Sequence, residues 1–219
     1  SDLKVNGNVS GGLVSDSSTV TVNGNVTGNG IDTVIAKKGT VTVNGTVTAT
    51  DLSEKTGVLA SNGSNLTVGD TEVGGKESTG VIAESGSKAT AGNVKVSGEY
   101  MTGTSAYGDS TVHVKGNVTA DGNGMTGVSV HDGDKSSLIV DGDVTATGEN
   151  SVGIYGETGI IKIGGDVSGR EAVITKGKAD VTVGGSVSGT LVGIVAGGNA
   201  AVSVKGDAGT KTGAGMFAQ

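Results

Sequence analysis

Two aspartates are the residues of this sequence that most resemble catalytic groups. Asp143 and Asp166 occupy the same position in two neighbouring sequence repeats, and Asn117 and Asp207 occupy it nearby. Paired carboxylates act as general acid and base in glycosidic bond cleavage, or as oxygen ligands for Ca²⁺. However, Arg170 is the only arginine, and aromatic residues, on which sugars stack, make up only 2% of the chain. Polysaccharide binding or cleavage at the Asp143/Asp166 face is therefore the alternative function.

A second group of acidic residues matches part of a calcium-binding loop. Asp132, Asp134, Ser136 and Asp143 have the spacing of the first, third, fifth and last ligands of such a loop. Ser137 stands where the sharp turn needs glycine, and the last ligand is Asp rather than Glu. The pattern therefore favours an ordinary polar turn.

The histidines are the remaining candidate metal ligands. His113 and His131 lie in different segments of one repeat, so we expect them on different faces of the molecule. The chain has no cysteine, which excludes Cys-based zinc sites. We therefore expect no metal and no cofactor.

Hydroxyl side chains alternate along one segment of several repeats, as in Thr48 and Thr50, Thr145 and Thr147, and Ser188 and Thr190. Flat threonine arrays are typical of ice-binding solenoids. Here Asn29, Asp121 and Arg170 interrupt the array. A solvent-exposed polar face is the favoured interpretation.

Composition excludes several classes of protein. Of 219 residues, 43 are glycine, and there is no proline, cysteine or tryptophan. Collagen needs glycine at every third position together with proline, and enzyme cores usually contain more aromatic residues. No apolar run is long enough to span a bilayer. The net charge of −7 makes nucleic acid and anionic membranes unlikely partners.

A short repeat explains this composition. The pattern apolar-x-apolar-x-Gly recurs ten times, at intervals that average about 22 residues. Its occurrences are Leu3–Gly7, Val20–Gly24, Val41–Gly45, Leu66–Asp70 in a looser form, Val94–Gly98, Val112–Gly116, Leu138–Gly142, Ile161–Gly165, Val181–Gly185 and Val202–Gly206. Each repeat continues with a second run, such as Asn25–Gly28, and a third run of the form Gly-apolar-apolar-Ala, such as Gly57–Ala60.

Runs this short, with alternating apolar residues, predict β-strands rather than helices. Stacking like runs in parallel gives an all-β, right-handed parallel β-helix of about ten coils, with three short strands per coil. Glycine supplies the corners, and the absence of proline lets every strand donate its N–H groups. An antiparallel sandwich with Asn-Gly and Asp-Gly hairpins is the other fold considered. Strands of about four residues at so regular a period favour the β-helix.

The repeats at Val20–Thr27, Val41–Thr48 and Ile139–Thr147 resemble those of bacterial surface proteins with β-helical passenger or adhesin-like domains. The resemblance extends over essentially all of the chain but rests on composition and period. It implies an exported, non-enzymatic protein at the bacterial surface or outside the cell, and it transfers no functional residues. We expect one β-helix domain over residues 1–219, as a segment of a longer repeat protein, because neither end carries a polar cap.

Alternation assigns the two sides of each strand. In the first run Val20, Val22, Val181 and Val183 are expected to face inward. The third run has two adjacent apolar residues, so one of them must face outward. This predicts an outward ladder, interrupted by Ser129 and formed by Val14, Ile35, Leu59, Ile82, Tyr107, Tyr155, Ile174, Val195 and Phe217.

An exposed apolar ladder of roughly 500 Å² is large enough to be an interaction site. We therefore predict a structural or adhesin-like protein that associates through this ladder, either with itself or with a cell-surface partner. In the other interpretation, the loops Asp51–Thr56 and Gly69–Thr79 fold over the ladder and cover it.

Overall fold

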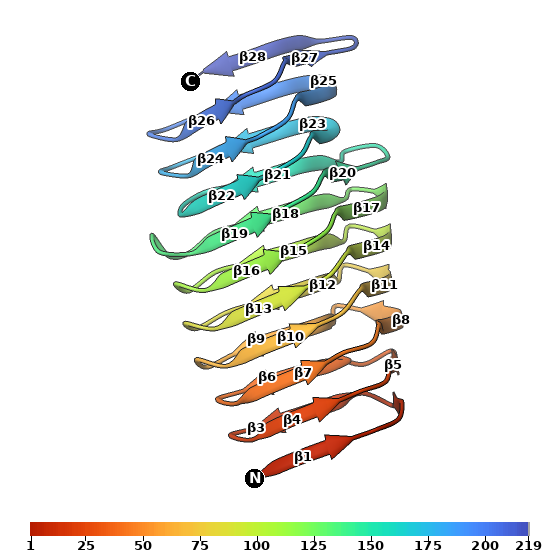
Figure 1. The fold of residues 1–219 in the computed structure, drawn as a ribbon. Helices are drawn as coiled ribbons and strands as arrows, with labels where there is room; N and C mark the ends of the chain where they lie inside the picture. Colours follow the sequence, from red (N-terminus) through yellow and green to blue (C-terminus); the bar gives the residue numbers. More distant parts are fainter. Residues whose placement is uncertain (219) are drawn as a thin grey trace.

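The computed structural model describes residues 1–218, and they form a rod of stacked coils in which all regular structure is β-strand. Figure 1 shows the coils lying one above another, with the two termini at opposite ends of the rod. All strand pairs are parallel and join one coil to the next. The first-strand sheet contains ten strands, so about nine turns separate the first from the last. The chain is therefore a parallel β-helix, as the repeat predicts.

The strands fall into three stacks. First strands are β1 (Asp2–Val5), β4 (Thr19–Val22), β7 (Thr40–Val43), β10 (Asn65–Val68), β13 (Lys88–Ala91), β16 (Thr111–Val114), β19 (Ser137–Val140), β22 (Ile160–Ile163), β24 (Asp180–Val183) and β26 (Ala201–Val204). Second strands are β2 (Val9–Ser10), β5 (Val26–Asn29), β8 (Val47–Ser53), β11 (Thr71–Lys76), β14 (Val94–Glu99), β17 (Val118–Asn123), β20 (Val144–Ala146) and β27 (Ala208–Thr210). Third strands are β3 (Leu13–Asp16), β6 (Val34–Lys37), β9 (Thr56–Ser61), β12 (Thr79–Ala83), β15 (Thr102–Ala106), β18 (Thr126–Val130), β21 (Val152–Gly156) and β28 (Ala214–Ala218). In two coils, β23 (Val167–Thr175) and β25 (Val187–Ala196) serve as second and third strand together.

The core is a narrow column of small apolar side chains. Val22, Val181 and Val183 are fully buried and Val20 nearly so, which confirms the predicted inward positions. Between them Thr21 and Thr182 are partly exposed. Because each coil adds the same few valines and alanines, burial repeated along the rod replaces the large aromatic core of a globular domain.

The fifth coil begins earlier than the sequence predicts. Its first strand is β13, in which Ala89 and Ala91 fill the inward positions, and not Val94–Gly98. Val94 and Val96 are inward residues of the second strand β14, so Lys95 projects from the second-strand face. Alanine fits this narrow core as well as valine does. A repeat pattern based on larger apolar residues therefore does not detect this strand.

A column of glycines allows the chain to bend between the second and third strands. Gly98 pairs with Gly75 below it and with Gly122 above it. The φ angles of Gly98 and Gly122 are +145° and +140°, which side-chain-bearing residues rarely adopt. A Cβ on Gly122 would overlap the carbonyl oxygen of Gly98. These glycines therefore set how closely successive coils approach at the bend.

Candidate functional site

The predicted carboxylate pair belongs to a hydrogen-bonded ladder along the turn after the first strand. The backbone N–H of Asp166 donates to Oδ1 of Asp143 at 2.8 Å, and the N–H of Ser186 donates to Oδ1 of Asp166 at 2.7 Å. The Asp143 N–H in turn donates to Oδ1 of Asn117 at 2.8 Å. Each side chain thus accepts from the same position of the following coil, a bond that asparagine makes as well as aspartate. This contact gives Asp143 and Asp166 a structural role.

The calcium-loop residues do not converge. Ser136 is fully buried, and its Oγ accepts a bond from the backbone N–H of Asp109 at 3.1 Å. Asp143 lies in the turn ladder, away from Asp132 and Asp134. His113 lies 3.0 Å from Asp141 beside the first-strand sheet, whereas His131 follows the third strand β18. Within residues 1–218, no three histidine, aspartate or glutamate side chains gather as metal ligands.

The third-strand face carries the predicted apolar ladder with one correction. In register from coil to coil, the outward residues are Val14, Ile35, Leu59, Ile82, Ser105, Ser129, Tyr155, Ile174, Val195 and Phe217. Ser105 therefore holds the position that the sequence analysis gave to Tyr107, which lies two residues further along the chain. We call these ten residues the apolar ladder, although its centre consists of two serines.

Within residues 1–218, the loops expected to cover this ladder do not fold over it. The segments expected to fold over it are largely strands: Asp51–Ser53 belongs to β8, and Thr71–Lys76 forms β11. They pair with neighbouring coils and turn directly into the next third strand. Val14 and Phe217 near the two ends of the ladder are 64% and 50% exposed. The two loops named in that interpretation are thus largely strands of the sheet, and the ladder residues between the ends of the rod are partly exposed or, at Ser105 and Ser129, buried.

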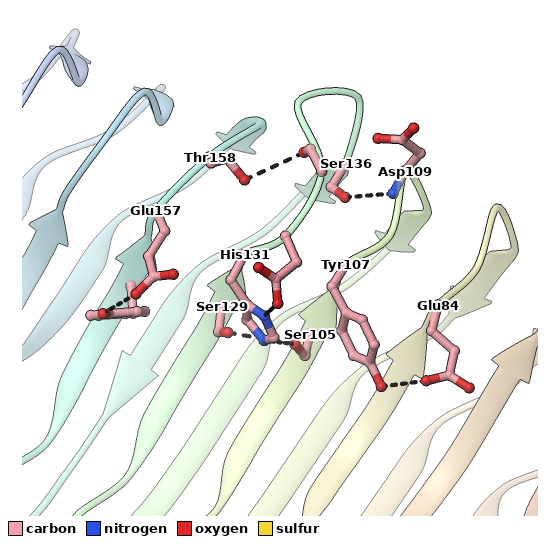
Figure 2. Close-up of polar contacts among 12 residues, drawn as sticks. Glu84, Ser105, Tyr107, Asp109, Ser129, His131, Ser136, Glu157 and Thr158 are labelled. Carbon is pink, nitrogen blue, oxygen red and sulfur yellow. Dashed lines mark hydrogen bonds and ion pairs between the residues drawn. The ribbon is translucent and has the colours of Figure 1, made fainter.

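Next to the ladder runs a second row of side chains, one from each of five successive coils. This polar row consists of Glu84, Tyr107, His131, Glu157 and Lys176, each two residues after the ladder residue of its coil. The Tyr107 and His131 rings stack with their centroids 5.1 Å apart. Figure 2 shows Tyr107 pointing toward Glu84, whose carboxylate accepts the phenol hydrogen bond. The displaced tyrosine therefore still lies on the third-strand face.

The imidazole of His131 covers the two serines of the ladder. Its Nε2 lies 3.5 Å from Ser105 Oγ, and Ser105 Oγ lies 3.5 Å from Ser129 Oγ. The two serines are consequently buried, at 5% and 8% exposure, although they are on the outer side of the sheet. Figure 2 shows the two serines on either side of the ring. The centre of the ladder, which we call the notch, is thus polar, lies between two apolar stretches and has the His131 ring over it.

A serine, a histidine and an aspartate meet at this notch, since His131 Nδ1 lies 3.3 Å from Asp132 Oδ2. The order of groups is that of a nucleophile, a base and a carboxylate. Acyl transfer also needs N–H donors aimed at the developing oxyanion. Ser105 lies inside strand β15, which pairs on both sides with β12 and β18, and the ring covers its hydroxyl. This geometry suits packing and binding rather than nucleophilic attack.

In the apolar ladder, Tyr155 is held by two charged side chains of the polar row, which come from two coils. Its hydroxyl donates to Glu157 Oε1 at 2.6 Å, and the Lys176 ammonium lies 5.5 Å from its ring centroid. The hydrogen bond to Glu157 raises the pKa of Tyr155, burial adds to the increase, and Lys176 opposes it. The face therefore presents tyrosine as a neutral donor beside both signs of charge.

The Tyr107 phenol gives a measurable signature of this cluster. Burial raises the pKa of Tyr107 above its ordinary value of 10.0, and the bond to Glu84 raises it further. Because the folded-state value exceeds the unfolded one, the stabilisation is complete below pH of about 10 and is lost as pH rises through the folded-state pKa. We expect spectrophotometric titration of Tyr107→Phe to lack one of the tyrosine transitions that the wild type shows above pH of about 10. Loss of a transition near pH 10 instead would contradict the cluster.

The sequence does indicate the correct register of β15, although the apolar pattern alone does not. Gly103 and Ala106 preserve the Gly-x-x-Ala frame of the third run around Thr104 and Ser105. Following that frame would have placed Ser105 in the ladder. The Tyr107–His131 stack has no comparable signal, because it depends on side chains from two coils.

No protein-family model matches the chain, and no curated protein or solved structure is similar to it. The described residues also include no helix of the length and hydrophobicity needed to cross a membrane.

Proposed function

We propose that this chain is a rigid, non-enzymatic β-helical rod that associates through its third-strand face. The observation that carries the proposal is the in-register apolar ladder on the outside of the third strands. Such a stripe loses water contact when it packs against another surface, which favours association. A second copy of this chain is the partner that the chemistry of the face fits best.

The residues of the face complement one another when two rods run in opposite directions. A two-fold axis parallel to the strands keeps ladder opposite ladder and polar row opposite polar row. With the axis level with β18, Glu84 of one copy lies opposite Lys176 of the other. At the same time Tyr155 lies opposite Ser105, over which the His131 ring lies, and Ile82 lies opposite Ile174. Charge and size therefore match at one register.

Two registers in which the axis lies nearer the N-terminal coils lack this pairing of opposite charges. Moving the axis midway between β15 and β18 places Glu84 opposite Glu157, which is repulsive. Moving it to the level of β15 places Lys176 opposite Lys37, the residue of β6 that lies two positions beyond Ile35. Like charges at an interface cost affinity and exclude wrong registers. The two registers displaced toward the N-terminal coils are thus disfavoured by like charges, whereas the proposed register is favoured by its own contacts.

The area of the face is sufficient for a specific dimer. Nine coils overlap in the antiparallel register, which gives a contact about 43 Å long and about 17 Å wide. Each copy then buries roughly 700 Å², so the total of about 1,400 Å² falls within the range of stable interfaces. The ladder alone would fall below that range, so the polar row is part of the interface.

The same proposal places the rod at the bacterial surface or outside the cell, as an adhesin-like structural element. It is supported by the resemblance of repeats such as Val20–Thr27 to those of bacterial surface proteins. A straight rod whose coils all have the same architecture spaces and presents contacts along its length, as solenoids do.

Sedimentation equilibrium over a wide range of protein concentration tests the proposal. We expect the mass to rise from the monomer value of 21.0 kDa to twice that value and then stay constant. A closed two-fold contact leaves no further ladder exposed, so growth stops at two copies. A monomer mass at all concentrations, or a mass that continues to rise, contradicts the proposed association.

A further inference from the structure

A hollow on the second-strand face, away from the ladder, has the composition of a binding site for an acidic ligand. Its volume is about 220 Å³, and it lies on the second strands of four successive coils, which belong to β20, β23, β25 and β27. Its walls are hydroxyl-bearing side chains together with Arg170 and Lys211; the hydroxyls belong to Thr145, Thr147, Ser151, Ser168, Ser188 and Thr190. The chain has a net charge of −7, so two cations in one hollow run against the overall charge.

The strand register arranges these side chains in two parallel rows. One row contains only hydroxyls, because Thr145, Ser168 and Ser188 pair directly from coil to coil. A second row lies two residues further along, at Thr147, Arg170, Thr190 and Lys211, and it is irregular at Arg170, where the pairing of β23 with β25 shifts between Gly169 and Glu171. Arg170 and Lys211 are therefore two coils apart, or about 9.6 Å along the rod. Arg170, which interrupts the threonine array in the sequence, stands at the centre of the hollow.

Arg170 is held in place by the coil below. Its Nη1 donates to Oδ1 of Asn150 at 2.8 Å, and its backbone N–H donates to Oγ of Ser151 at 3.1 Å. A guanidinium has five N–H donors in a planar fork, and this arrangement engages one of them through Asn150. The fork is thus positioned to bind a carboxylate or sulfate in the bidentate manner that arginine favours.

A second hollow on the same face has charged lining side chains whose charges cancel. It is lined by Thr48, Thr50, Glu72 and Lys95, among others. Glu72 and Lys95 pair in register, so the only cation of that hollow has an acidic neighbour. In the Arg170 hollow the acidic side chain on the same row is Asp121, at its lower end, where it accepts a bond from Thr147 at 2.5 Å. The cationic part, from Arg170 to Lys211, lies beyond it.

We propose that this hollow binds an acidic oligosaccharide. Arg170 and Lys211 bind carboxylate or sulfate groups on the sugar, and the two hydroxyl rows exchange hydrogen bonds with its ring hydroxyls. Serine and threonine both donate and accept, which suits a ligand rich in hydroxyl groups. The site is on a different face from the apolar ladder and is independent of the proposed dimer.

Isothermal titration calorimetry of the full chain tests this with four probes. They are a tetramer of galacturonate, a heparin-derived tetrasaccharide, neutral maltotetraose and inorganic sulfate. We expect one or both acidic oligosaccharides to bind, and maltotetraose and inorganic sulfate to bind far more weakly. Binding of the first two probes separately distinguishes a carboxylated from a sulfated ligand. No binding of either acidic oligosaccharide, or equal binding of inorganic sulfate, overturns the proposal.

Matched variants locate the binding. Arg170→Gln and Lys211→Gln should each weaken binding at least about tenfold, because each removes a charge-assisted contact. Lys95→Gln removes one positive charge from the same face and should change affinity by less than about twofold. Arg170→Lys keeps the charge without the fork and should give an intermediate loss. Equal losses for Arg170→Gln and Lys95→Gln would mean a diffuse charge effect and overturn the assignment to this hollow.

Discussion

Gly122→Ala is expected to destabilise the β-helix by about 3–5 kcal/mol. The added methyl would overlap the carbonyl oxygen of Gly98 in the coil below, and the φ of +140° would be strained for alanine. Backbone lies on both sides of the contact, so no side-chain rotation relieves it. The glycine column would have to open, which separates the paired strands β14 and β17. Urea denaturation followed by far-ultraviolet circular dichroism measures the loss.

Gly86→Ala is the control for this substitution. Gly86 has a φ of +74°, but nothing lies within 4 Å of a Cβ at this position. The change therefore carries the conformational cost of alanine alone, about 1–2 kcal/mol. Equal urea midpoints for Gly86→Ala and Gly122→Ala would show that close approach of the coils does not determine stability at the bend.

Replacing Ile82 and Ile174 together by serine is expected to abolish association of the rods. In the proposed register these residues face each other, and the two-fold axis makes the contact twice. Burial of an isoleucine contributes about 1.5–3 kcal/mol, so removal of four such side chains should raise Kd by at least about a thousandfold. The monomer fold is expected to persist, because both residues project outward. Sedimentation equilibrium measures the change.

Ile139→Ser provides the matched control for the ladder variant. Ile139 is also a partly exposed, outward isoleucine in the middle of a strand, but it belongs to β19 in the first-strand sheet. Its loss should leave the dimer mass unchanged. If Ile139→Ser weakens association as much as the ladder variant does, the contact surface is not the third-strand face.

Much of the architecture could be predicted because each coil repeats the same local rule. Alternation of Val20, Thr21 and Val22 specifies which side of the strand is buried, and glycine after each run specifies a corner. Parallel stacking follows once like runs are aligned. The predicted positions were wrong where a smaller or polar residue takes the place of a large apolar one. Ala89 and Ala91 replace valine in β13, and Ser105 replaces the apolar ladder residue in β15.

The candidate sites were less predictable because they depend on several coils at once. Tyr107 and His131 stack across two third strands, and Ser105 is buried only because His131 reaches back over it. Arg170 interrupts a threonine array in the sequence, whereas in the structure it lines one hollow together with Lys211. Conversely, Asp143 and Asp166 share a column as predicted, but their side chains bind backbone N–H groups. Such roles follow from three-dimensional register and not from residue type.

Zero-length carbodiimide cross-linking followed by mass spectrometry of peptides tests the antiparallel rod pair most directly. Within one copy, Glu84 and Lys176 are four coils apart, about 19 Å along the rod, which a direct amide bond cannot span. The account predicts a Glu84–Lys176 cross-link in the dimer band and its absence from the monomer band. A dimer band without this link, but with links from the first-strand sheet, would contradict association through the third-strand face.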